Sequence, residues 1–64
     1  MDEYEVQNAI EKRMSTDKKY NRQMQKAVEE DNTNEIIKLI YKVCEVVPVI
    51  AEIIAWIFKL FKRS

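Results

Sequence analysis

Apolar residues recur at helical spacing in the first half of the chain, between stretches of charged residues. A narrow apolar stripe with acidic residues at its start predicts a first helix over residues 2–14. Ser15, Thr16 and Asp17 are three possible N-caps for a second helix, but these residue types only weaken a helix, so one continuous rod is the alternative. The predicted apolar positions are Tyr4, Val6, Ile10 and Met14 in the first helix and Tyr20, Met24, Ala27 and Val28 in the second.

A firmer boundary lies at residues 31–34, where four polar residues follow one another. Asn32 is placed to cap a third helix, with Glu35 at its third position as in a capping box. Over residues 33–62 the pattern predicts one long apolar helix that Pro48 interrupts, because proline costs about 3 kcal/mol inside a helix. This helix therefore either kinks at Pro48, or a fourth helix begins with that residue.

Charged residues recur every seven positions along this predicted helix, at Lys38, Glu45, Glu52 and Lys59. On an α-helix this spacing aligns them on one line, which argues against the alternative of a buried strand over residues 46–58. The rest of the circumference is apolar and much wider than the stripe of a two-stranded coiled coil. The predicted interaction face consists of Ile40, Val43, Val47, Ile50, Ile54, Trp56, Ile57, Phe58 and Phe61, and the predicted basic end of Lys59, Lys62 and Arg63.

The two halves of the chain differ in composition. Residues 1–32 read as a charged amphipathic region and residues 33–64 as an apolar one, together forming one small all-α hairpin or bundle of three to four helices. In the apolar half, 20 of the 26 residues at 36–61 are apolar, against 10 of 35 at residues 1–35. An uncovered apolar face of a few hundred Å² costs several kcal/mol, about the whole stability of a small domain. We therefore expect something besides the N-terminal helices to cover this face.

Three partners are candidates for that cover. A homo-oligomer or a target protein is favoured, because wide apolar faces suit assemblies of several helices and helix-in-groove binding. The alternative is a membrane, with residues 46–63 as an interfacial or inserted helix anchored by Trp56 and the basic end. Nucleic acid is the least favoured partner; it would bind the basic residues Lys18, Arg22 and Lys26 of the second helix.

The residue types argue against catalysis. The chain has no histidine for general acid–base chemistry and no glycine for a phosphate-binding loop, so we expect no enzymatic activity, no catalytic residues and no small-molecule substrate. With Cys44 as the single cysteine, we expect neither an intrachain disulfide nor a metal site, and we expect no cofactor. An unpaired thiol and an acidic start without a secretory signal favour the cytoplasm, or its membrane surface, as the location.

Overall fold

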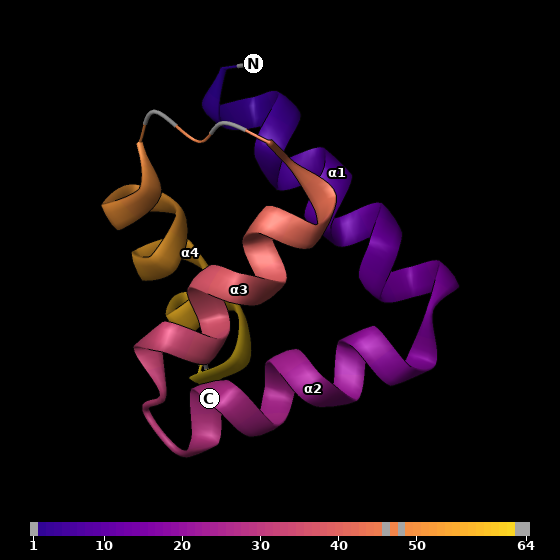
Figure 1. Ribbon diagram of the computed structural model, residues 1–64, viewed down its shortest axis with the longest axis vertical. Helices are drawn as coiled ribbons and strands as arrows, with labels where there is room; N and C mark the ends of the chain where they lie inside the picture. Colours follow the sequence, from indigo (N-terminus) through magenta and orange to yellow (C-terminus); the bar gives the residue numbers. More distant parts are fainter. Residues whose placement is uncertain (1, 46, 48, 63–64) are drawn as a thin grey trace.

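The computed structural model describes residues 2–45, 47 and 49–62, and it confirms the all-α fold class. This part of the chain forms four helices, and each of them contacts the other three. In Figure 1, α1 descends to a corner with α2, α3 rises from the other end of α2 back toward α1, and α4 passes behind α3. The helices are α1 (Glu3–Thr16), α2 (Lys18–Glu29), α3 (Thr33–Val43) and α4 (Ile50–Lys62).

Short polar side chains set where the first three helices begin. The Asp2 carboxylate accepts the Glu5 backbone N–H at 2.9 Å, which satisfies one of the free donors of α1. Asp17 has extended backbone angles between α1 and α2, and its carboxylate accepts the Tyr20 N–H at 3.1 Å. The continuous rod is therefore wrong, and Asp17 is the residue that serves as N-cap. The predicted cap of the third helix is confirmed, because Asn32 accepts the Glu35 N–H at 3.2 Å.

The corner between α2 and α3 closes without glycine. Asp31 has a positive φ of 51°, the left-handed conformation that glycine usually supplies after a helix. The Asn32 N–H donates to the Ala27 carbonyl at 2.8 Å and the Asp31 N–H to the Val28 carbonyl at 3.1 Å. These two hydrogen bonds form a Schellman motif, so the last carbonyls of α2 are satisfied within the turn.

The predicted long C-terminal helix is wrong, because the chain turns between α3 and α4. Cys44 has extended backbone angles (φ −127°, ψ 132°) and donates its N–H to the Ile40 carbonyl at 3.0 Å, which ends α3. The fourth helix begins at Ile50, so the strand alternative over residues 46–58 is also wrong. The predicted kink or helix start at Pro48 falls on a residue outside the described part of the chain. The turn lets α4 fold back onto the other helices instead of extending away from them.

The core lies where the four helices meet, and none of the described polar or charged side chains is fully buried in it apart from the Tyr20 hydroxyl. That hydroxyl donates to the Leu39 carbonyl at 2.6 Å, which joins α2 to α3. The Arg13 guanidinium lies 5.3 Å from the Tyr20 ring centre and covers the ring from α1. Burial raises the pKa of Tyr20 to about 12. The buried core residues are Val6, Ile10, Tyr20, Met24, Ala27, Val28, Ile36, Leu39, Ile40, Cys44, Val47, Ile53 and Ile57.

Candidate interaction surface

The structure divides the predicted interaction face between the core and its edge. Ile40, Val47 and Ile57 are buried within the chain's own core. The other six residues are half-buried and pack against that core. The apolar residues of α3 and α4 therefore cover one another to a large extent, and the surface that remains is smaller than the sequence pattern implies. The half-buried residues are Val43, Ile50, Ile54, Trp56, Phe58 and Phe61.

Helix α4 has a sharply divided surface. Ile53 and Ile57 are completely buried, one turn apart, and they fix which side of α4 faces inward. On the opposite side Ala51, Glu52, Ala55, Lys59 and Lys62 are exposed. Trp56 and Phe58 are half-buried at the two edges of this exposed strip. The outward side of α4 is thus a narrow mixed surface with small, charged and aromatic side chains.

A groove of about 320 Å³ runs between α1 and α4. It is lined from α1 by Glu3 and Gln7, both half-buried. The α4 side consists of the exposed residues Glu52, Ala55 and Lys59 and the half-buried Trp56. The two carboxylates and one ammonium group of the lining give the groove a formal charge of −1. We call this surface the docking face; its residues are Glu3, Gln7, Glu52, Ala55, Trp56 and Lys59.

A second hollow, of about 600 Å³, continues from the docking face to the end of α4. Trp56 and Lys59 line both depressions, so the surface is continuous. Its apolar lining comes from Trp56, Phe58 and Leu60. Lys62 lies at its rim, where its ammonium group is 5.1 Å from the Phe58 ring centre and 2.8 Å from an Asp31 carboxylate oxygen. This ion pair ties the end of α4 to the α2–α3 corner.

The predicted basic end is only partly described. Lys59 is exposed, and no ion pair to it occurs among the described residues. Lys62 is exposed but engaged with Asp31, and Arg63 lies outside the described part of the chain. Lys59 is therefore the described cation of this end with the greatest freedom to meet a partner.

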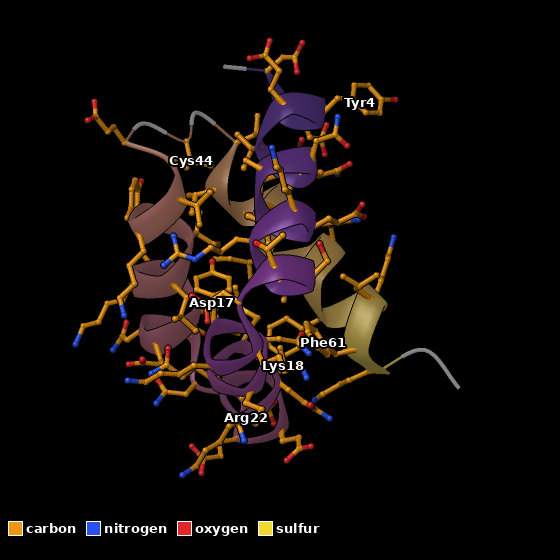
Figure 2. The ribbon with its side chains drawn as sticks, turned by 90° about the vertical axis from the view of Figure 1, so that its right-hand side faces the viewer. Tyr4, Asp17, Lys18, Arg22, Cys44 and Phe61 are labelled. Carbon is orange, nitrogen blue, oxygen red and sulfur yellow. The ribbon has the colours of Figure 1, made fainter. Side chains whose placement is uncertain are left out.

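Three basic residues and two tyrosines are also exposed but do not line the docking face. Lys18, Arg22 and Lys26 are exposed along α2, and Figure 2 shows Lys18 and Arg22 at the lower part of the molecule, remote from Tyr4. Tyr4 projects outward from α1 with 75 % of its surface exposed, and Tyr41 on α3 exposes 45 %. These two tyrosines are the large apolar residues with the greatest exposure in the described chain.

The structure shows the surroundings of the single thiol. Cys44 is buried at the end of α3, and desolvation raises its pKa, so the thiol stays in its weakly nucleophilic protonated form at neutral pH. Among residues 2–45, 47 and 49–62, no three His, Cys, Asp or Glu side chains gather in the way a metal site needs.

Sequence reasoning did not find the α1 side of the docking face. Glu3 and Gln7 stand four residues apart on α1, next to the buried stripe, and their alignment was readable from helical spacing. The sequence could not predict that these two residues lie beside α4, because their position relative to α4 depends on the turn before Ile50. Ala55 and Leu60 were likewise absent from the predicted interaction face, although both lie in the apolar helix predicted over residues 33–62.

Comparison of the chain with protein-family models, with curated protein sequences and with solved structures finds no match. Within the described residues, none of the helices is long and apolar enough to cross a bilayer.

Proposed function

We propose that this protein is a non-enzymatic helical interaction module that docks on another protein through the docking face and the adjoining hollow at the end of α4. The position of Trp56 carries this proposal. It is the single tryptophan of the chain, and it lines both depressions on the outer side of α4. Tryptophan is among the residues that contribute most to binding when a partner covers them.

The surroundings of Trp56 support the same function. A binding site needs apolar area at its centre and charged groups that fix orientation at its rim. Phe58 and Leu60 supply apolar area beside Trp56, and Glu52 and Lys59 are exposed next to it with opposite charges. Acid–base or nucleophilic chemistry has little support, because the surface holds carboxylates and ammonium groups without a histidine or an activated thiol.

The test asks whether Trp56 contributes mainly to binding or mainly to the packing of the core. We expect Trp56→Gln to lower the free energy of unfolding by less than about 2 kcal/mol, because the ring is only half-buried, whereas truncating a buried core residue costs roughly 2–5 kcal/mol. The same substitution should weaken association, measured by sedimentation velocity. Cover of the ring by a partner is read in the unchanged protein as reduced acrylamide quenching of Trp56 fluorescence, because the chain has a single tryptophan. Unfolding measured in urea would show which description holds.

Tyr41→Gln is the control, because it removes an aromatic ring that is more exposed than Trp56 and lies on α3. It should leave both stability and association unchanged. A loss of stability for Trp56→Gln as large as that for Ile57→Ala would make Trp56 part of the core and contradict the proposal.

A second candidate function, docking on a membrane surface, is favoured by one observation. The hollow at the end of α4 combines aromatic and aliphatic side chains with Lys59 and Lys62, a pairing that suits the bilayer interface. In this case Lys59→Gln should weaken binding to vesicles containing phosphatidylserine by about 1 kcal/mol, or roughly fivefold, and vesicles of phosphatidylcholine alone should bind poorly. Equal binding of both lipids, or none, would remove this candidate.

A further inference from the structure

Two of the three charged residues on the outer side of α4 are placed symmetrically about its middle, and the third, Lys62, is paired with Asp31. Glu52 and Lys59 are both exposed and stand seven residues apart, which is two turns and about 10 Å along the helix. Ala55 and Trp56 lie midway between them. Ala51 and Ala55 are exposed and small, so another helix can approach the backbone of α4 closely along this strip.

We infer that the partner of the docking face is a second copy of this chain, with the two α4 helices packed antiparallel about a two-fold axis near Ala55 and Trp56. This inference rests on the proposed function and names its partner. A two-fold axis at that point places Glu52 of each copy opposite Lys59 of the other. A parallel arrangement would instead oppose Glu52 to Glu52 and Lys59 to Lys59, which like-charge repulsion disfavours.

The α1 side of the groove adds a further carboxylate to the docking face. Glu3 and Glu52 both line it, against the single ammonium group of Lys59, so the groove has a formal charge of −1 before a partner arrives. A second copy brings the same formal charge of −1, so the complementarity lies in the Glu52–Lys59 pairs across the axis and not in the summed charge of the two faces. The zero formal net charge of the chain removes long-range repulsion between copies.

The size of the face sets the expected strength of the dimer. Helix α4 has 13 residues and is therefore about 20 Å long. Two such helices with a rim from α1 bury an area at the small end of specific interfaces, below roughly 1,200 Å². We therefore expect a reversible dimer whose population depends on protein concentration.

The decisive experiment exchanges the two charges separately and then together. Sedimentation velocity over a concentration series should show a monomer–dimer equilibrium for the unchanged protein. Glu52→Lys and Lys59→Glu should each weaken the dimer about tenfold or more, because each puts like charges opposite one another. An equimolar mixture of these two variants should dimerise again, since every charge then meets its opposite across the axis. The double variant Glu52→Lys/Lys59→Glu should also recover the dimer.

Matched controls change net charge equally at exposed positions elsewhere. Glu29→Lys on α2 and Lys42→Glu on α3 should leave the equilibrium unchanged, alone and in mixture. A protein that stays monomeric at millimolar concentration would overturn the inference. So would a dimer that responds to the α4 exchanges no more than to the controls; if Trp56→Gln still disrupted that dimer, the proposed function would stand with a different arrangement. A dimer indifferent to Trp56→Gln as well would contradict both.

Discussion

The buried hydroxyl of Tyr20 offers a direct test of how the helices are held together. Tyr20→Phe removes the hydrogen bond to the Leu39 carbonyl and leaves the ring in the core. Because α3 continues to Val43, the Leu39 carbonyl keeps its helical partner and is not left unsatisfied. The free energy of unfolding should therefore fall by only about 1 kcal/mol at neutral pH. For 64 residues the whole stability is roughly 3–10 kcal/mol, so this loss is measurable.

The Tyr20 hydroxyl also makes the difference in free energy of unfolding between the unchanged protein and Tyr20→Phe depend on pH. Its pKa rises from 10.0 to about 12 in the folded chain, because burial disfavours the charged phenolate. The folded state holds the proton more tightly than the unfolded state, so this stabilisation is complete below pH 10 and is lost as pH rises from 10 toward 12. At pH 11 the loss is about 1.4 kcal/mol, and Tyr20→Phe does not suffer it. The advantage of the unchanged protein at pH 7 should therefore vanish near pH 11.

Urea unfolding followed by circular dichroism at both pH values gives the four free energies that are needed. Titration of lysines and of the other tyrosines is common to both proteins and cancels in the difference. A difference of the same size at pH 7 and pH 11 would refute the argument that burial holds the Tyr20 proton. A loss above about 3 kcal/mol at pH 7 would mean that the ring repacks, as in truncation of a core aromatic.

Three further predictions concern α4 and the helix caps. Ile57→Ala should cost roughly 2–5 kcal/mol and keep a single unfolding transition; separate transitions for Trp56 fluorescence and circular dichroism would show α4 detaching by itself. The Tyr20 N–H and then the Arg13 side chain lower the pKa of Asp17, so its stabilisation is present above pH 3.8 and disappears as pH falls through the lowered value. In acid titrations of thermal stability, Asp17→Asn should keep the cap but lose this dependence, whereas Asp17→Ala should lose both. Asn32→Ala should cost about 1 kcal/mol in a thermal melt, and Asn32→Asp should restore it.

Local signals along the chain predicted much of the fold. Asn32 was recognisable as a cap, and Asp17 as one of three possible caps, because a short polar side chain three residues before a backbone donor is a local arrangement. The buried face of α2 was also predicted correctly, with Tyr20, Met24, Ala27 and Val28 all in the core. These features depend on residues close together in sequence, which is why periodicity and capping preferences are sufficient to find them.

The break after Val43 could not be predicted in the same way. Apolar spacing reports which residues are buried, and residues on both sides of the turn are buried, so the pattern continues although the helix does not. The seven-residue line of charges is accordingly split, with Lys38 on α3, Glu45 in the turn, and Glu52 and Lys59 on α4. The predicted need for an external cover assumed a straight helix. Because α4 folds back onto the other helices, the apolar surface that stays uncovered is limited to the docking face and the hollow beside it. The residues that α1 contributes to the docking face could be found only from the tertiary structure.

Asp31 combines a backbone role and a side-chain role that favour different residue types. Its backbone conformation favours glycine, while its carboxylate holds Lys62 from the far end of the sequence. A change to glycine relaxes the corner by about 1 kcal/mol and loses an exposed ion pair worth at most about the same, so the two effects nearly cancel. Asparagine keeps the backbone preference and loses only the charge. Position 31 can therefore change to glycine or asparagine at little cost to folding. Either change removes the ion pair with Lys62 at the end of α4, so evolutionary change at position 31 also removes the reason to keep a lysine at position 62.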